Sequence, residues 1–385
     1  MSLVAKHIQE IPYSGIRKFF DIANEVDGVI SLGVGEPDFS TPWACKERAI
    51  YTLEQGKTTY TSNAGLLELR QEISKYIKNT LDLDYCYNKQ VLVTVGASEG
   101  IDIALRSVVN QGDEVLVVEP CFVSYKPCVN MCGGVPICIK TQEKNDFRLT
   151  PEDLEGKITS KTKAILLCYP NNPTGAIMEK CDFEKIVNIL KDKDILIISD
   201  EIYSELTYDS KKHISIAQFK EVYDKTVILN GFSKSFAMTG WRLGFAVGPA
   251  DIISAMTKIH QYIIMCAPTL SQYAGIEALT SCLSNVEEMR REYNRRRLFM
   301  LNGFREMGIE CFEAKGAFYL FPNIKSTGLS SSEFCERLVY EEKVAVVPGT
   351  AFGDCGEGYI RCSYAYSIQE IKEALARIKN FIKKL

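Results

Sequence analysis

The sequence is poor in the residues that mark several common classes of binding site. It has three histidines and two tryptophans among 385 residues, and its 14 cysteines include no Cys-x-x-Cys pair. Because zinc sites need regularly spaced cysteine or histidine ligands, we expect no metal site. The nearest candidates are irregularly spaced, at Cys121, Cys128, Cys132 and Cys138. Most cysteines lie in apolar runs, which is typical of a chain kept reduced, so we expect a cytoplasmic protein.

Long apolar runs and blocks of one charge are also absent. No run approaches the roughly 18 apolar residues of a membrane helix, and residues 1–10 lack the apolar centre of a secretory signal. The net charge is −4. The densest charged run, residues 287–297, alternates acids and bases as a solvated helix face does. We therefore expect neither a nucleic-acid partner nor a membrane partner.

Short apolar runs alternate with helical patterns through the first two thirds of the chain. This is the βαβ pattern of an α/β protein with a mostly parallel sheet covered by helices on both faces. Helices are predicted between most strands, over Ser98–Asn110, over Cys181–Lys191 and, as a short helix, near Ser215–Lys220. The strands are predicted at Val91–Val95, Val115–Val118, Ala164–Cys168, Ile195–Ser199, Thr226–Leu229 and Leu243–Val247.

The flanking regions predict two further parts. Helices are expected over Arg17–Val26, over Pro42–Leu53 with Thr41 as its N-cap, and through one continuous region, Gln272–Met307. The remainder mixes short strands with helices. We predict a large α/β domain over residues 46–284 and a smaller α+β domain built from residues 1–45 and 285–385.

A lysine directly follows the predicted strand Thr226–Leu229 and its short extension. Lys234 should lie at the carboxyl edge of the sheet, where open α/β sheets bind ligands. Burial there would lower the pKa of its amine, which could then form a Schiff base with a carbonyl. Ser233 and Arg242 nearby suit a phosphate. A Schiff base and a phosphate site together describe pyridoxal 5'-phosphate (PLP), although a lone Ser-Lys pair also fits a surface loop.

Other polar residues follow the remaining strands. Ala97 and Ser98 open a helix, and such a helix start can bind a phosphate. Phe122 could stack on a flat ring, and Asn172 lies in a turn of two prolines, two asparagines and a glycine that would hold its amide rigidly. Each residue also fits an ordinary turn or core position.

Two more candidates carry charge. Asp200, after the strand at Ile195–Ser199, could keep a ring nitrogen protonated, with Tyr203 reaching the same ligand. An aspartate in this place is a helix cap about as often. Arg361 lies on the predicted strand Tyr359–Ser363 and could pair with a substrate carboxylate or with a structural anion.

Together and in this order, these residues resemble the class I and II aminotransferases of PLP fold type I. The resemblance covers nearly the whole chain, and its most specific parts are Asn171–Gly175 and Ser233–Gly244. It implies PLP as the cofactor, an amino acid and a 2-oxo acid as substrates, and a homodimer. Tyr60 would reach the phosphate of the neighbouring subunit.

The resemblance also implies a role for each candidate. Lys234 would carry the coenzyme and move the substrate proton, and Asp200 would pair with the pyridinium nitrogen. Tyr203 and Asn172 would bind the ring oxygen, and Phe122 would stack on the ring. The α-carboxylate would bind Arg361 close to Gly35. The phosphate would be held by Ala97, Ser98, Ser233 and Arg242.

The function expected from this resemblance is transfer of an amino group between an L-amino acid and a 2-oxo acid by a ping-pong mechanism. A C–S β-lyase of the same fold is the alternative, because such enzymes share the lysine, aspartate and arginine. A non-catalytic PLP-binding regulator is a third possibility, but no DNA-binding segment is found. Some relatives with acidic substrates carry a lysine at the position of Ser98, and this chain does not.

Overall fold

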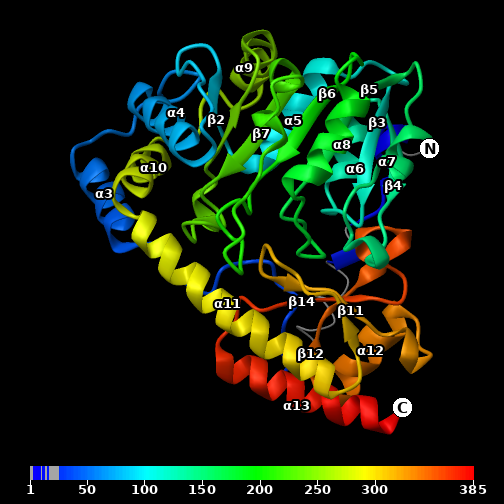
Figure 1. Cartoon of the computed structure of the whole chain (residues 1–385). Coiled ribbons are helices and arrows are strands. Elements are labelled where there is room, and N and C mark those ends of the chain that lie inside the picture. Colours follow the sequence, from blue (N-terminus) through cyan, green and yellow to red (C-terminus); the bar gives the residue numbers. More distant parts are fainter. Residues whose placement is uncertain (1–2, 10, 14, 17–25) are drawn as a thin grey trace.

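A seven-stranded sheet forms the centre of the larger part of the molecule (Figure 1). The computed structural model describes residues 3–9, 11–13, 15–16 and 26–385. The order across the sheet is β2-β8-β7-β6-β5-β3-β4, with β8 antiparallel to both neighbours and the other adjacent pairs parallel. The carboxyl ends of β2, β3, β5, β6 and β7 therefore lie at one edge. The strands are β2 (Val91–Thr94), β3 (Glu114–Glu119), β4 (Val135–Lys140), β5 (Thr162–Cys168), β6 (Leu196–Asp200), β7 (Thr226–Gly231) and β8 (Gly244–Val247).

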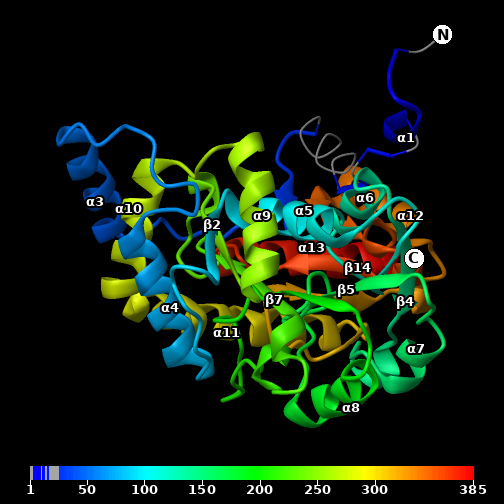
Figure 2. The same ribbon diagram turned by 90° about the horizontal axis from the view of Figure 1, so that it is seen from above.

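Both faces of this sheet are buried because alternate strand residues feed two separate cores. Val115 and Val117 pack in the core on the side of α5 (Gly96–Val108), α6 (Tyr125–Met131) and α9 (Ala250–Ile263). Leu116 and Val118 pack in the opposite core, with α7 (Pro151–Glu155) and α8 (Lys180–Leu190). Figure 2 shows these two groups of helices on either side of the sheet. The expected α/β class with a mostly parallel sheet is confirmed.

Three further helices pack together beyond the β2 edge. They are α3 (Trp43–Glu54), α4 (Leu67–Leu81) and α10 (Thr269–Ser281). The prediction that Thr41 caps α3 is wrong. Pro42 occupies the cap position without a side-chain bond, and the Thr41 hydroxyl instead donates to the carbonyl of Ala237 over 2.7 Å.

The long helical region expected over 272–307 consists of two helices. The chain breaks at Cys282, between α10 and α11 (Leu283–Glu306), without a glycine or proline. Cys282 is buried, and its sulfur lies 3.6 Å from that of Cys45 in α3. Packing against a distant helix thus sets a boundary that local sequence does not mark. In Figure 1, α11 runs from the end of α10, beside α3, down to α13 (Ile368–Lys384).

The C-terminal part has its own apolar core, formed by α11, α12 (Ser331–Glu342), α13 and short strands. The N-terminal strand β1 (Ile30–Ser31) pairs in parallel with β12, which joins the two ends of the chain. Such pairing is what the predicted smaller domain, built from residues 1–45 and 285–385, would require. The boundaries of the two domains stay a prediction. The short strands are β9 (Glu310–Cys311), β10 (Tyr319–Leu320), β11 (Pro322–Asn323), β12 (Val344–Ala345), β13 (Val347–Pro348) and β14 (Ile360–Ser363).

Some elements differ from their predictions. Strand β4 was not predicted, and the helix expected near Ser215 is a single turn at Ile216–Gln218. The helix α1 (Lys6–Gln9) lies beside α6, whereas the helix expected over 17–26 falls largely on residues 17–25, outside the described residues. Throughout the part of the chain that the structure describes, no helix combines the length and apolar character that a membrane crossing requires.

Candidate active site

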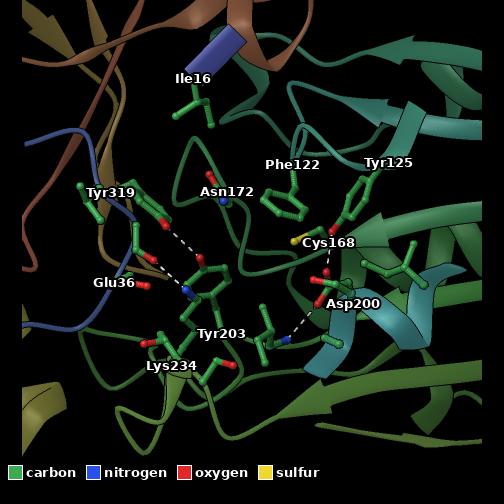
Figure 3. Close-up of a pocket in the computed structure, with 18 of the residues that line it drawn as sticks. Ile16, Glu36, Phe122, Tyr125, Cys168, Asn172, Asp200, Tyr203, Lys234 and Tyr319 are labelled. Carbon is green, nitrogen blue, oxygen red and sulfur yellow. Dashed lines mark hydrogen bonds between the residues drawn. The ribbon is translucent and has the colours of Figure 1, made fainter. Parts of the chain in front are cut away.

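A cavity of about 280 Å³ lies at the carboxyl edge of the sheet, where it meets the strands of the C-terminal part (Figure 3). Tyr60 does not line it, and 79% of the Tyr60 side chain is exposed. The cavity brings together the other sequence-predicted site residues, namely Gly35, Ala97, Ser98, Phe122, Asn172, Asp200, Tyr203, Ser233, Lys234, Arg242 and Arg361.

Lys234 follows β7 and points into this cavity. Its Nζ donates a hydrogen bond to the carbonyl of Gly35 over 2.6 Å. Burial, with a smaller contribution from the nearby charges of Arg361 and Arg242, lowers the pKa of the amine to about 8, while Glu36 opposes the shift. A substantial fraction of the amine is therefore neutral near physiological pH, which gives Nζ the lone pair of a nucleophile.

Asp200 ends β6 and is almost fully buried at the floor of the cavity. The Tyr125 hydroxyl donates to its Oδ2 over 2.7 Å, and the backbone N–H of Ile202 donates to Oδ1 over 3.2 Å. Burial raises the pKa of the carboxyl to about 6, although these two hydrogen bonds oppose the rise. Near neutral pH the group is an anion with spare acceptor capacity, which suits a cationic N–H.

The start of α5 has the features of a binding site for an anion the size of a phosphate. Gly96 has φ +75°, and a Cβ placed on it would lie 2.7 Å from Nη2 of Arg242. The guanidinium thus packs directly against a backbone that only glycine allows. No side chain caps α5, so its first N–H groups are available to an anion. Further polar lining comes from Ser98 and Ser233.

Arg361 projects from β14 and is 2% exposed. Its Nη1 donates to Oδ1 of Asn172 over 2.9 Å, and its Nη2 donates to the carbonyl of Gly33 over 2.6 Å. The guanidinium lies 4.4 Å from the ring centre of Tyr319 and 4.7 Å from that of Phe352. Its Nε is buried without a hydrogen-bond partner among the described residues. A buried N–H donor of a cation that lacks a partner is a favourable position for an anion.

The turn after β5 is held by Asn171. Its Oδ1 accepts hydrogen bonds from the backbone N–H of Thr174 over 3.1 Å and from the Thr174 hydroxyl over 2.8 Å. Its amide donates to the carbonyl of Pro120 over 3.3 Å. Asn171 therefore fixes the turn, and Asn172 is left to face the cavity.

The lining residues that the sequence did not predict include Tyr125, Tyr319 and Glu36. Tyr125 holds Asp200, and Tyr319 shares a 2.9 Å hydrogen bond between its hydroxyl and that of Tyr203. The Glu36 carboxylate enters from the N-terminal segment. Only Glu36 had a local signal, because it adjoins Gly35. The ring of Phe122 packs edge-on against Tyr125, with centroids 5.8 Å apart.

These groups match the chemistry of PLP. An amine of lowered pKa suits an aldehyde, a buried carboxylate suits a ring nitrogen, and the glycine-lined helix start beside Arg242 suits a phosphate. The unpaired Nε of Arg361 leaves a donor for a second anion, such as a carboxylate. Elsewhere in the described ranges, no three or more histidine, cysteine or acidic side chains gather in a way that could hold a metal ion.

Comparisons with known proteins agree with this site. A family model described as aminotransferase class I and II matches residues 27–378. The YugH protein of Bacillus subtilis is 51% identical over 100% of this chain and 99% of that protein. An aspartate aminotransferase of Pyrococcus abyssi is 46% identical over 96% of each chain. The structure of an aromatic aminotransferase from Pyrococcus horikoshii has a TM-score of 0.91 at 43% identity, covering 95% of this chain and 99% of that one.

The fold and these matches define an aminotransferase with the aspartate aminotransferase-like fold. The chain belongs to the class I and II aminotransferase family. The predicted family and enzyme class are confirmed. Membership implies the use of PLP and of amino acid and oxo acid substrates.

Proposed function

We propose that this enzyme moves an amino group between an L-amino acid and a 2-oxo acid in two half-reactions. One observation carries the proposal: a lysine amine whose pKa is lowered to about 8 shares a cavity with a buried carboxylate and with an arginine that has an unpaired Nε. The lysine amine can react with an aldehyde, the buried carboxylate can accept a hydrogen bond from a cationic ring nitrogen, and the arginine can bind the carboxylate of an amino acid.

Each lining residue then has a proposed binding role. Asp200, held by Tyr125, would accept from the ring nitrogen, and Phe122 would pack on the ring face. Tyr203 and Asn172 would hydrogen-bond the ring oxygen. The phosphate would be held by Ala97, Ser98, Ser233 and Arg242. When bound, PLP supplies an electron sink for the carbanion at the substrate Cα.

The protein contributes proton transfer and orientation. Nζ of Lys234 is positioned to take the proton from the substrate Cα and to return it, because its pKa lies near the working pH. Arg361 would grip the α-carboxylate and so fix which Cα bond faces the lysine. The carboxylate would lie close to Gly35, where the absence of a side chain lets the Tyr319 hydroxyl pack against the backbone, since a Cβ there would overlap that hydroxyl.

The cavity wall favours an apolar substrate side chain. Ile16 and Phe122 lie near each other at the side opposite Lys234 (Figure 3). Among the described residues that line the cavity, the cations are Lys234, Arg242 and Arg361, and each has a role above. A distal carboxylate thus finds no cation from this part of the chain. We propose that aromatic and large aliphatic amino acids are donors, as the name of the Pyrococcus horikoshii relative indicates for that protein.

We also propose a homodimer. Large apolar side chains stand exposed along α3 and at the end of α9, with Trp43 64%, Tyr262 84% and Ile263 59% accessible. Large apolar side chains that are this exposed are unfavourable in water unless a partner covers them. Tyr60, on the loop that follows α3, would then reach the phosphate of the neighbouring active site.

Single half-reactions test the function. The PLP-loaded enzyme is mixed with one amino acid at a time, and the coenzyme absorbance, the keto acid and ammonia are followed. Transfer predicts stoichiometric keto acid, no ammonia, and turnover only after 2-oxoglutarate or pyruvate is added. Continuous release of pyruvate and ammonia from a cysteine-type donor would show the lyase instead. A panel with phenylalanine, leucine and aspartate tests the proposed side-chain preference, which is wrong if aspartate has the highest kcat/KM.

A further inference from the structure

Two carboxylates stand side by side at the end of β6 and face different cavities. Asp200 lines the coenzyme cavity, whereas Glu201 lines a second cavity of about 350 Å³ between α4, the segment 204–213 and α11. Both side chains are almost fully buried. Burying one carboxylate is costly, and burying two neighbours adds repulsion between them.

Both oxygens of the Glu201 carboxylate have hydrogen-bond donors. Its Oε1 accepts from the hydroxyls of Ser199 over 2.8 Å and Ser215 over 2.6 Å. Its Oε2 lies 2.7 Å from Nε2 of His213. Glu201 therefore holds its charge in a fixed place directly behind Asp200, on the side away from the cavity.

That charge acts on Asp200 because little water separates the two groups. Burial raises the pKa of the Asp200 carboxyl to about 6, and the negative charge of Glu201 contributes to that rise. A carboxylate with higher proton affinity binds a ring N–H more strongly, and a second nearby anion also favours the ring cation.

We propose that Glu201 is a positioning residue for the transamination reaction: its fixed negative charge strengthens the hold of Asp200 on the proton of the coenzyme ring nitrogen. The inference rests on the proposed function, in which Asp200 is the partner of that nitrogen. Glu201 is not among the residues that line the coenzyme cavity, so its charge acts on the ring nitrogen at a distance and through Asp200.

Other titratable groups near the pair must be considered in any pH measurement. Around Asp200 they are Tyr125 of α6, Cys168 of β5 and Lys234. Around Glu201 they are His213, Tyr76 of α4, Tyr85, Glu205, Lys211, Lys212, Glu287 and Arg290.

The test compares Glu201→Gln with Glu205→Gln. Glutamine keeps the acceptor for both serines and removes the charge. Glu205 lines the same second cavity and accepts from Tyr76, but it does not adjoin Asp200, so Glu205→Gln is a matched control for loss of one carboxylate. PLP affinity of each apoenzyme is titrated across pH 4.5 to 8.5. Affinity should rise with pH as Asp200 ionises, because the ionised form binds the ring cation.

Glu201→Gln lowers the proton affinity of Asp200, so we expect the midpoint of that rise to move down by roughly 0.5 to 1 pH unit. We expect kcat to fall about threefold to tenfold at saturating PLP, with KM for the amino acid unchanged. Glu205→Gln should change neither quantity. An unmoved midpoint with normal kcat in Glu201→Gln overturns the inference, as does an equal effect of both substitutions.

Failure of the underlying function is distinguishable. Asp200→Asn should abolish the part of the rise that is centred near pH 6, whereas the part that follows loss of the Lys234 proton near pH 8 should remain. If Asp200→Asn leaves the former part intact, Asp200 is not the nitrogen partner and the proposed site fails. If Asp200→Asn abolishes that part while Glu201→Gln leaves its midpoint in place, only the role of Glu201 fails.

Discussion

Arg361 and Asn172 join the two parts of the molecule at the cavity, through a 2.9 Å hydrogen bond from Nη1 to Oδ1. The arginine lies on β14 of the C-terminal part, and the asparagine lies on the turn after β5 of the large sheet. The proposed site for the substrate carboxylate is therefore built from both parts. A movement of one part relative to the other would therefore change the position of the unpaired Nε of Arg361.

Arg361→Lys should weaken amino acid binding without loss of the coenzyme. Lysine keeps the charge but lacks the planar fork, so it cannot replace both the bond to Asn172 and a paired grip on a carboxylate. We expect Kd for amino acids and 2-oxo acids to rise about tenfold to a hundredfold. Single-turnover titration measures this, with the coenzyme spectrum as the check on loading.

The matched probe for this variant is the decarboxylated amine of the same amino acid. Because it has no carboxylate, it should react equally poorly with the parent and with Arg361→Lys. Unchanged amino acid affinity, or loss of PLP from the variant, would instead make Arg361 a structural residue.

Asp200→Asn should slow the chemistry much more than it weakens coenzyme retention. An amide cannot hold the ring nitrogen as a cation, so the electron sink is lost while the phosphate and ring contacts remain. We expect kcat to fall by about 10² or more. Stopped-flow measurement of the first half-reaction gives the rate. A kcat within a few-fold of the parent would leave Asp200 a structural group.

Gly96→Ala should lower PLP affinity. Its Cβ would meet the Arg242 guanidinium at 2.7 Å, and the positive φ strains any side chain. Gly112→Ala is the control, since Gly112 has φ +85° but open space around its Cβ position. We expect both variants to lose about 1 kcal/mol of stability, and only Gly96→Ala to raise the PLP Kd, by about tenfold or more. Equal Kd values for both would remove the role of this turn in phosphate binding.

Hybrid dimers test the contribution of Tyr60. Tyr60→Phe alone should weaken PLP binding, because its hydroxyl would be lost from the neighbouring site. In a hybrid of one Tyr60→Phe subunit and one Lys234→Ala subunit, the only site with a lysine receives its tyrosine from the Lys234→Ala subunit, so that site should have parental PLP affinity. A weakened site in this hybrid would place Tyr60 in its own subunit's active site, and a monomer in sedimentation would contradict the dimer.

The sheet and its catalytic edge could be predicted because their signals are local. Lys234 and Asp200 each follow an apolar strand, and parallel strands bring such positions to one edge. The turn at Asn171–Gly175 carries its rigidity in its own residues. These features need no knowledge of distant contacts.

The features that were missed depend on contacts between distant residues. Tyr125 donates to an aspartate 75 positions away, and Tyr319 meets Tyr203 across 116 positions. The break at Cys282 and the hydrogen bond from the Thr41 hydroxyl to Ala237 likewise follow from tertiary packing. No periodicity or turn signal encodes such pairs, because the local sequence is compatible with several partners.

The most direct test of the account is to find the lysine that holds the coenzyme. The PLP-loaded enzyme is reduced with borohydride, digested and mapped by mass spectrometry. Lys225 serves as an internal comparison, since burial also lowers its pKa but its Nζ donates to backbone carbonyls outside the cavity. We expect one modified residue, Lys234, in the parent enzyme. The Lys234→Ala variant should show neither an adduct nor turnover. An adduct on another lysine, or near-parental turnover in Lys234→Ala, would contradict it.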